Sequence, residues 1–600
     1  MSAFAAIVRG DSAAASLRYR EVARALSAVY GTAPAVHLTE GCVLLAAPLP
    51  GSGDESFAVD APSGVAAAGH VLLEDREALA RELALHADVS ALRVAIAAFT
   101  RWGEKCTLRF SGEFSFALWD ERQRSLLCAR DGLGMRQCFV ARAADAVVVS
   151  NMSSAAIAYP ATPRDLDEPS LVRFLASGSM NPGSTAYRAV TPLPPGHTLR
   201  LCRAGAELWR HWRFPETGTR LVRDPREAIA GYRAALEAAV RDRLTRPRVS
   251  ILLSGGIDSG TLAAAARSAA PSVDLEAATA VYSRAPQNSE VSRARLTADA
   301  LRIPWRSVDA DRHAALHHLG GAWPTPQPMD EPSLTDWRAL IAAAASFSTV
   351  ALYGEDGDSL FLPPRYAALR RASPLSHVIR DTVSFTIENR RLPYLGLRLR
   401  ERLRIRPAAH RTRTAPTWLT APARSLLHLS DLPAVLGQRP DPLPPHATRP
   451  LAQQRLQVGI ADYMAAVISA DVTRAPIDLR CPLLDSRVIR FVMNVAPIPW
   501  CQGKRLARHA YCDVLPSAVC AHPKRGVGGL DAALARDWQA RGHEVPQLPP
   551  PLDRWIDDAS WRRALHDTAE VGAAWRVLQL AEWLERRGQA GGAQDYLCTA

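Results

Sequence analysis

The sequence predicts two domains of different fold class, an α+β sandwich at residues 1–215 and an α/β domain with a parallel sheet at 216–600. In the first part, short apolar stretches alternate with turn residues, which is typical of short strands. After about residue 227, continuous apolar runs alternate with helical patterns, and this order predicts buried parallel strands joined by right-handed crossovers. A charged segment with a proline at 220–226 separates the two patterns and is the expected linker.

The expected elements follow from local apolar patterns. In the first domain, strands are predicted at 42–47, 114–119 and 146–149, with turns at Asp131-Gly132 and Pro194-Pro195-Gly196. In the second, helices are predicted at 228–244 and 261–270, and strands at 249–253, 277–282 and 350–353. An Arg- and Pro-rich segment at 362–450 is expected to be a surface insertion, and a helical part follows from 451 to the end.

The composition excludes several classes of protein. With 48% hydrophobic and 22% charged residues, the 600-residue chain is an ordinary soluble globular protein. No run reaches the ~18 apolar residues that a membrane span needs, and the N-terminus lacks a signal peptide, so we expect a cytoplasmic protein with no membrane partner. The ten cysteines are scattered without a CxxC pair, which fits a reducing compartment. The net charge of +12 comes from dispersed arginines without a nucleic-acid motif, so no nucleic-acid partner is expected.

A glycine-rich loop after the strand at 249–253 carries the strongest chemical signal. It reads Ser254-Gly255-Gly256-Ile257-Asp258-Ser259 and precedes a predicted helix. The two glycines let the backbone turn sharply toward a ligand, and the helix N-terminus stabilises an anion there. Asp258 would repel phosphate unless Mg²⁺ bridges them. No Lys follows the glycines as in a P-loop, and the SGGxDS form is the signature of ATP pyrophosphatases, which cleave ATP between the α and β phosphates.

A second loop fits the same chemistry. Gly354-Glu355-Asp356-Gly357-Asp358 follows the predicted strand at 350–353 and places acids beside glycines. Carboxyl ends of parallel strands meet at one edge of a sheet, where such folds bind ligands. We therefore expect Asp358 to join Asp258 in holding Mg²⁺.

Both loops resemble the synthetase domain of the asparagine synthetases, as does the downstream segment from Asp478 to Asp485, Asp-Leu-Arg-Cys-Pro-Leu-Leu-Asp. The first domain resembles a class II (Ntn-type) glutamine amidotransferase. The segments that carry this second resemblance are Trp102-Gly-Glu, Phe110-Ser-Gly-Glu-Phe-Ser-Phe-Ala-Leu-Trp-Asp120, Ala129-Arg-Asp-Gly-Leu-Gly134 and Leu193-Pro-Pro-Gly-His197.

The amidotransferase resemblance breaks at the residues of its active site. The family uses an N-terminal Cys as nucleophile, where this chain has Ser2. Its Asn-Gly glutamine-binding segment is replaced by Ala68-Gly69-His70, and its Ser-Asp pair reads Ser90-Ala91, so the expected acid is missing. We therefore expect the domain to be an inactive structural relic.

The resemblance also implies roles for individual residues. It places the nucleoside against Leu252, Leu253, Val281 and Gly354, and the phosphates on Ser254, Gly255, Gly256 and Ser259. It makes Glu355 with Asp478 the acceptor of the amine proton, although a salt bridge from Asp478 to Arg480 remains the alternative. Lys524, before the glycine-rich segment 526–529, matches the late lysine that stabilises the oxyanion intermediate and the leaving phosphates. Lys504 is a weaker candidate, expected at the start of a solvated helix.

An adenylating domain without its own ammonia supply needs an amine from the substrate. Two branches of the family work in this way, the β-lactam synthetases and the lasso peptide macrolactam synthetases. The 362–450 insertion favours the second, because a peptide needs more binding surface than an amino acid. The prediction is an ATP- and Mg²⁺-dependent ligase that joins the N-terminal amine of a precursor peptide to an Asp or Glu side chain, partnered by a leader peptidase of the same pathway. The alternatives are a β-lactam-forming or ammonia-dependent asparagine synthetase-like enzyme acting on a small amino acid, and a non-enzymatic ATP sensor.

Overall fold

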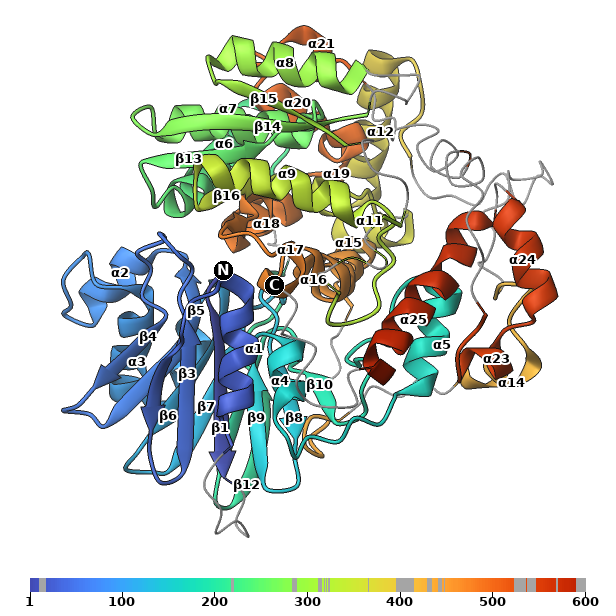
Figure 1. Cartoon of the computed structure of the whole chain (residues 1–600). Coiled ribbons are helices and arrows are strands. Elements are labelled where there is room, and N and C mark those ends of the chain that lie inside the picture. The colour runs from blue at the N-terminus through green and yellow to red at the C-terminus, as the bar shows by residue number, and fades with distance from the viewer. Residues whose placement is uncertain are drawn as a thin grey trace.

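The computed structural model shows two domains in contact along one face (Figure 1). The residues that it describes are 1–9, 18–216, 221–282, 289–310, 316–317, 319, 321, 324–364, 366–394, 415–428, 434–440, 445–446, 448–522, 536, 547–567 and 570–589. Among these residues, no helix has the length and apolar character that crossing a membrane requires.

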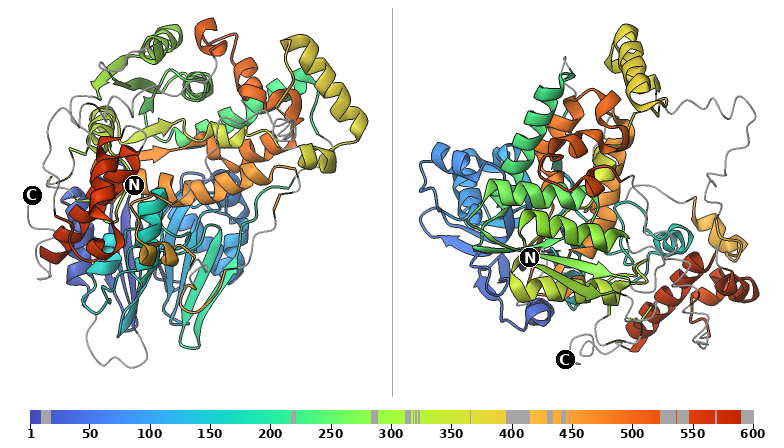
Figure 2. Two further views of the ribbon diagram at one scale, coloured as in Figure 1. Left: turned by 90° about the vertical axis from the view of Figure 1, so that its right-hand side faces the viewer. Right: turned by 90° about the horizontal axis from the view of Figure 1, so that it is seen from above.

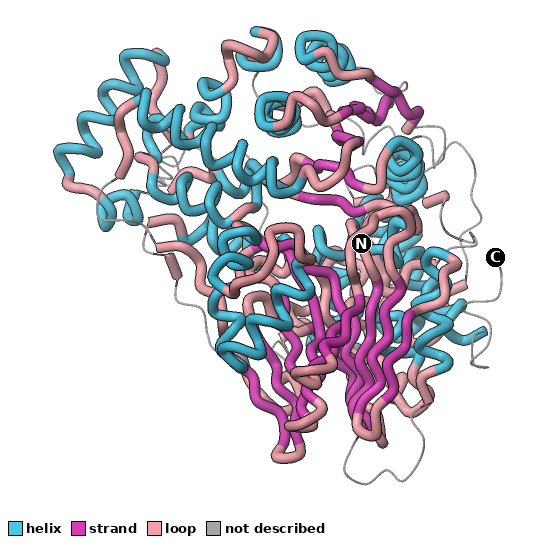
Figure 3. Tube along the Cα trace, turned by 90° about the vertical axis from the view of Figure 1, so that its left-hand side faces the viewer, coloured by secondary structure: helices cyan, strands magenta, loops and turns pink. Residues whose placement is uncertain are grey.

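The first domain is a sandwich of two six-stranded antiparallel sheets, visible as two stacked sets of strands in Figure 3. One sheet has the order β10-β8-β9-β1-β3-β2, with β1 at Ala3–Arg9, β2 at Ala35–Leu38, β3 at Cys42–Ala47, β8 at Phe139–Arg142, β9 at Ala146–Ser150 and β10 at Val190–Pro192. The other has the order β12-β11-β7-β6-β5-β4, with β4 at Phe57–Asp60, β5 at Val65–Leu73, β6 at Gly112–Asp120, β7 at Ser125–Arg130, β11 at His197–Cys202 and β12 at Gly205–Arg210.

Helices cover both outer faces of the sandwich, so most strands are apolar on both sides. In β1, Phe4 and Ala6 pack between the sheets, whereas Ala5 and Ile7 face the helices, as the two-residue period of a strand requires. The helices of this domain are α1 (Arg20–Tyr30), α2 (Arg76–Glu82), α3 (Ala91–Trp102), α4 (Ser153–Ala158) and α5 (Glu168–Ser177), with the 3-10 helix η1 (Gly103–Arg109). The predicted strands of the first domain and its fold class are confirmed.

The second domain is built on a five-stranded parallel sheet in the order β15-β14-β13-β16-β17. The strands are β13 (Arg248–Leu252), β14 (Asp274–Val281), β15 (Trp305–Asp309), β16 (Val350–Tyr353) and β17 (Asp478–Arg480). The chain adds strands on one side of β13 and then returns to add β16 on the other. The loops after β13 and β16 therefore meet at the switch point of the sheet, where open α/β folds bind ligands.

Helices cover both faces of this sheet. The first group is α6 (Pro225–Arg243), α7 (Ile257–Ala269), α8 (Ser289–Leu301), α9 (Leu334–Phe347), α10 (Gly357–Leu360), α18 (Ser486–Asn494), α19 (Pro497–Trp500), α20 (Arg505–Ala510) and α21 (Ser517–Cys520), with η3 (Pro482–Leu484) and η4 (Gln502–Lys504). A second group, α15 (Pro450–Gln454), the π-helix η2 (Arg455–Met464), α16 (Ala465–Val467) and α17 (Ala470–Thr473), lies toward the sandwich in Figure 1. The predicted alternation of helix and strand is confirmed.

The 362–450 segment and the C-terminal helices extend over both domains. In the 362–450 segment, α11 (Tyr366–Ala372) precedes α12 (Leu375–Asn389). Helix α12 projects from the body of the molecule (Figure 2). Farther along, α14 (Ala421–Leu426) packs against α5 and against α23 (Leu552–Trp555). Of the last helices, α25 (Val571–Gln589) lies beside α5, and α24 (Asp558–His566) packs on α25. Trp561 and Trp575 belong to the same hydrophobic core as Ala5 and Ile7 of β1. The end of the chain thus returns to the first domain.

A buried network of ion pairs fixes strand β17 to the sandwich. Arg136, in the loop after β7, contacts Asp478 at 3.0 Å and Glu113 of β6 at 2.8 Å. Arg480 closes on Asp478 at 2.7 Å, and Arg243 at the end of α6 reaches Glu113 at 2.8 Å. These side chains are at most 4% exposed. Buried charges need partners, so the network admits one orientation of the domains.

Removing the central cation of this network should destabilise the protein strongly. Arg136→Met leaves Asp478 and Glu113 buried with one partner fewer, and losing one partner of a buried pair costs about 3–5 kcal/mol. The matched control is Arg124→Met, whose ion pair with Glu40 is largely exposed and contributes at most about 1 kcal/mol. Thermal unfolding followed by circular dichroism measures both. Equal shifts in Tm for the two variants would contradict a special role for Arg136.

Candidate active site

The loop after β13 has the tight turn that the glycines predict. Gly255 has φ +78°, and a Cβ there would lie 2.0 Å from the carbonyl oxygen of Glu290, so only glycine fits. Helix α7 begins at Ile257, and its N-cap Gly256 makes no side-chain capping bond. Backbone N–H groups of the first turn therefore point toward an incoming anion.

Hydroxyl groups hold this loop in shape. The Oγ of Ser259 accepts a hydrogen bond from the N–H of Ser254 at 3.2 Å and lies 3.1 Å from the Oγ of Ser254. Arg293 donates from Nε to the carbonyl of Gly255 at 3.2 Å. These hydrogen bonds hold the backbone of the predicted phosphate loop in its turn, and a loop fixed in this way loses little entropy on binding.

The second loop packs directly on the first. A Cβ at Gly354 would lie 3.0 Å from Ser259 backbone atoms, and a Cβ at Gly357 would lie 2.5 Å from the Cγ of Asp258. Asp356 adopts φ +63° and accepts a hydrogen bond from Ser359 at 2.6 Å. The absence of side chains at the two glycines therefore permits the contact between the loops.

Lys504 lies at this contact and connects the two acids. Its Nζ forms an ion pair with the carboxylate of Asp258 and lies 2.7 Å from the Oδ1 of Asp358. The residue is 6% exposed and has φ +60°, directly before α20. The expectation of a solvated helix start is therefore wrong. A helix does begin after Lys504, but tertiary packing carries its side chain into the site.

The two aspartates suit a divalent cation. Both contact the same ammonium group, so their oxygens lie close enough to share one ion. Carboxylates are the ligands that Mg²⁺ prefers, together with water and phosphate oxygens. Asp258 and Asp358 would hold Mg²⁺, which would neutralise the phosphates of a bound nucleotide. No cluster of three or more His, Cys, Asp or Glu side chains that could hold a metal occurs in the described part of the chain, so the two aspartates would complete the ion's shell with water and phosphate oxygens.

The residues expected around the nucleoside lie at the same edge of the sheet. Leu252 and Leu253 are buried at the end of β13, and Leu253 donates its N–H to the carbonyl of Ala278 at 2.9 Å. Val281 ends the neighbouring strand β14, and Gly354 follows β16. The structure thus brings these four residues beside the phosphate loop. Lys524 lies outside the described residues.

A pocket of about 870 Å³ opens beside the two loops. Three parts of the second domain form its wall, namely the ends of β14 and β16, the start of α9, and the segment of α15, η2 and α16. Acidic side chains are prominent in this wall. The lining includes Tyr353, Glu355, Glu331, Asp336, Arg455 and Tyr463.

Glu355 and Tyr353 lie together in this pocket. Burial and the adjacent carboxylate of Glu355 raise the pKa of the Tyr353 phenol well above its usual value, so the phenol stays protonated. On the opposite wall, Tyr463 donates its hydroxyl to the carboxylate of Glu331 at 2.5 Å. The carboxylate of Glu355 is therefore the better proton acceptor of the Tyr353–Glu355 pair.

Asp478 does not reach Glu355. In the parallel register Asp478 pairs with Val350 at the start of β16, whereas Glu355 follows Tyr353 at the other end of this strand, roughly 10 Å farther along. Its carboxylate instead takes the salt bridge to Arg480 that the sequence left as the alternative. Burial alone would raise its pKa, but the guanidinium groups of Arg136 and Arg480 outweigh this effect and hold the pKa well below its usual value. Asp478 is thus a structural anion at the domain contact.

The position expected for a glutaminase nucleophile is closed. Ser2 is 2% exposed, its Oγ accepts the N–H of Leu49 at 3.2 Å, and its carbonyl accepts from Asn151 at 2.8 Å. His70 lies 3.5 Å from Asp478, and burial lowers the pKa of its ring well below the usual value. The ring is therefore a neutral part of the domain contact.

These features define a class of protein, an α/β nucleotide-binding ligase domain joined to an amidotransferase-like sandwich. Comparison with family profiles agrees: the asparagine synthase profile matches residues 231–585, and the glutamine amidotransferase domain profile matches residues 73–212. The chain belongs to the asparagine synthase family. The amidotransferase match begins beyond the segment of Ser2.

Individual relatives are distant and match partly. Asparagine synthetase (glutamine-hydrolyzing) 3 of Bacillus subtilis is 29% identical over 180 residues, 30% of this chain and 29% of that protein. The amidase chry2 of Gibberella zeae is 27% identical over 295 residues, 45% of this chain and 43% of that protein. An asparagine synthetase (glutamine-hydrolyzing) homologue of Mycobacterium tuberculosis is 26% identical over 458 residues, 72% of this chain and 69% of that protein. The chain thus spans less than half of the first two relatives.

The solved structure of a glutamine phosphoribosylpyrophosphate amidotransferase from B. subtilis, complexed with ADP and GMP, is 12% identical to this chain. The match covers 61% of this chain and 82% of that chain, with a TM-score of 0.26, which is too low to bear on function.

Replacing Gly255 should disrupt the phosphate loop. Gly255→Ala forces a Cβ into the carbonyl of Glu290 and a positive φ onto alanine, so we expect a lower Tm and loss of ATP–pyrophosphate exchange. Gly572→Ala in α25 is the control, because its Cβ would meet no atom within 4 Å. Exchange and thermal unfolding are measured on both. A Gly255→Ala protein with normal exchange would contradict the assigned loop.

Lys504 should be essential for handling the phosphates. Lys504→Met removes the cation between Asp258 and Asp358, and we expect ATP–pyrophosphate exchange to fall about 100-fold. Lys105→Met, at an exposed lysine, should leave exchange unchanged. Asp258→Asn should abolish exchange at any Mg²⁺ concentration. If Lys504→Met retains full exchange with an unchanged Tm, the lysine only fills space between the acids.

Proposed function

We propose that this protein is an ATP-dependent, AMP-forming carbon–nitrogen ligase that closes a macrolactam in a ribosomal precursor peptide. It adenylates an Asp or Glu side chain of the peptide and joins it to the N-terminal amine, as in lasso peptide biosynthesis. Membership of the asparagine synthase family supports the ligase chemistry. The precursor peptide would be its substrate and a leader peptidase of the same pathway its partner, in the cytoplasm.

The closed sandwich domain supports a nucleophile that comes from the substrate. Ser2 is buried and hydrogen-bonded, and position 91 carries an alanine where the amidotransferase pattern has an acid. Glu55, which could approach that region, is bound instead by Ser90 and Arg93. Ammonia from glutamine is therefore a poor source for the second half-reaction.

The size and charge of the pocket support the proposal that the substrate is a peptide. Its volume of about 870 Å³ lies near the upper end of the range for small-molecule sites, which is more than the reacting end of one amino acid needs. Glu331, Asp336 and Glu355 line it, and carboxylates attract a protonated amine. The amine end of the peptide would lie here, with its acceptor carboxylate directed toward the phosphate loop.

The reaction needs two displacements. First, an oxygen of the substrate carboxylate attacks the α-phosphorus of ATP and pyrophosphate leaves, with Ser254, Ser259 and Lys504 in contact with the phosphates. Next, the bound ammonium group gives one proton to Glu355, which frees the lone pair of the nitrogen. The amine nitrogen then attacks the acyl carbon, AMP leaves, and the nitrogen releases its second proton to solvent. Positioning and electrostatics carry most of this catalysis, because the loops are preformed and the cation at Lys504 lies where negative charge develops.

A second candidate is a β-lactam-forming or ammonia-dependent asparagine synthetase-like enzyme that acts on a small amino acid. Two of the relatives are named as asparagine synthetases, which favours it. It differs from the first proposal in the size of the substrate and, for the ammonia-dependent form, in the origin of the nitrogen.

Peptide turnover separates these proposals. The protein is incubated with ATP, Mg²⁺ and synthetic peptides that carry a free N-terminus and an internal Asp or Glu. We expect a peptide product lighter by one water, with one AMP and one pyrophosphate per ring. The N-acetylated form of each peptide is the control and should support ATP–pyrophosphate exchange without ring closure. Asparagine formed from aspartate and ammonia, with no peptide losing water, would overturn the peptide assignment.

A further inference from the structure

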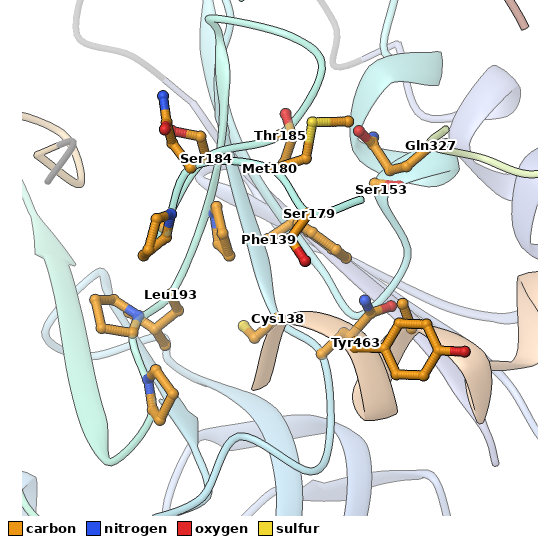
Figure 4. Close-up of a pocket in the computed structure, with 18 of the residues that line it drawn as sticks. Cys138, Phe139, Ser153, Ser179, Met180, Ser184, Thr185, Leu193, Gln327 and Tyr463 are labelled. Atoms are coloured by element: carbon orange, nitrogen blue, oxygen red, sulfur yellow. The ribbon is translucent and has the colours of Figure 1, made fainter. Parts of the chain in front are cut away.

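We propose that a second pocket, between the two domains, is a subsite for an uncharged stretch of peptide chain. This inference rests on the proposed function for the identity of the peptide, but the subsite itself is defined by its own geometry. Its volume is about 310 Å³, enough for a few residues. Figure 4 shows this pocket, with Phe139, Leu193 and Met180 around the cavity.

The walls of this pocket are apolar and rigid. Prolines from three separate segments line it, represented by Pro182, Pro194 and Pro326, alongside Phe139 and Phe174. Proline has a fixed φ and no N–H, so these walls lose little entropy on binding and leave few backbone donors to satisfy. Such a surface favours side chains and backbone of an uncharged peptide segment.

Arg130, Arg210 and Asp330 line this pocket, and hydrogen bonds to other parts of the protein engage Arg130 and Asp330. Arg130 donates to the carbonyls of Gly134, Arg136 and Leu193, each at 2.8 Å. Asp330 accepts from Arg576 at 2.8 Å. Neither is available as a specific partner for a charged ligand.

Two glutamines supply the polar recognition that a peptide backbone requires. Gln327 uses its Oε1 to accept the N–H of Ala186 at 2.7 Å, which leaves its buried Nε2 donor without a partner in the described part of the chain. Gln457 of η2 is 9% exposed, and its Oε1 acceptor likewise has no partner among those residues. A buried polar atom without a partner is costly, and a peptide unit supplies one acceptor and one donor to match this pair.

The subsite adjoins the candidate active site through one side chain. Tyr463 lines both pockets, and its hydroxyl donates to Glu331 on the side of the active site. The neighbouring Asp330 lines the second pocket. Figure 4 shows Tyr463 at one side of the cavity, across from Leu193. A chain that occupies the second pocket can therefore continue past Tyr463 toward the two catalytic loops.

Direct binding tests the subsite without requiring ligase activity. The probe is a mixture of short peptides rich in apolar residues, N-acetylated and C-amidated so that neither end can react. We expect the wild-type protein to retain a subset of them on ultrafiltration, detected by mass spectrometry. Gln327→Leu and Gln457→Leu each remove one hydrogen bond, and the double variant should weaken retention about tenfold.

Matched variants separate recognition from folding. Gln579→Leu replaces another buried glutamine, outside both pockets, and should leave retention unchanged. Ser179→Trp places a large side chain at an exposed position of the rim and should block binding even if the glutamine variants fold poorly. ATP–pyrophosphate exchange with the most active substrate peptide should persist in the double glutamine variant and in Ser179→Trp, with a KM raised about tenfold and kcat unchanged, whereas Gln579→Leu should keep the wild-type KM.

The possible outcomes distinguish the two proposals. Retention by the wild type that is lost in the variants supports the subsite, even if no peptide is cyclised and the proposed function falls. Ring closure by the wild type, with retention and KM unchanged in the double variant and in Ser179→Trp, would overturn the subsite alone. No retention of any peptide by the wild type would also overturn it.

Discussion

The buried ion pairs around β17 are the constraint on which the rest of the structure depends. Asp478 and Arg480 lie on an edge strand of the parallel sheet, yet their side chains are at most 2% exposed because Arg136 of the sandwich covers them. A buried charge without its partner is costly, so the sheet and the sandwich are held in one relative position. The second pocket, which residues of both domains line, depends on that position for its shape.

This constraint gives the sandwich a role without glutamine chemistry. Ser2 and His70 are both buried, the first hydrogen-bonded to Leu49 within the sandwich and the second beside Asp478 of β17. The same domain contributes Phe139, Leu193 and the prolines to the wall of the second pocket. The sandwich thus contributes to the shape of a pocket that it shares with the second domain.

The phosphate loops could be predicted because their chemistry is local. Gly255 must be glycine to turn after β13, and Asp258 and Asp358 follow neighbouring strands, so strand order alone brings them together. Lys504 gave no local signal, since Gln-Gly-Lys before a helix is typical of a solvated helix start. The prediction that Asp478 pairs with Glu355 was wrong for a different reason. The sequence did not reveal at which end of β17 Asp478 lies, and the register of the sheet places it away from Glu355.

The sequence by itself determined the two fold classes, the phosphate loop, the pair of acids and the loss of the amidotransferase pattern at positions 2 and 91. These depend on residue type and short-range order, which the chain displays directly. Only the tertiary structure decided that Lys504 bridges the acids, that Asp478 is a structural anion, and that Tyr463 lies between two pockets. Those features arise where segments hundreds of residues apart pack together, and burial rather than local pattern sets the partner of each charge.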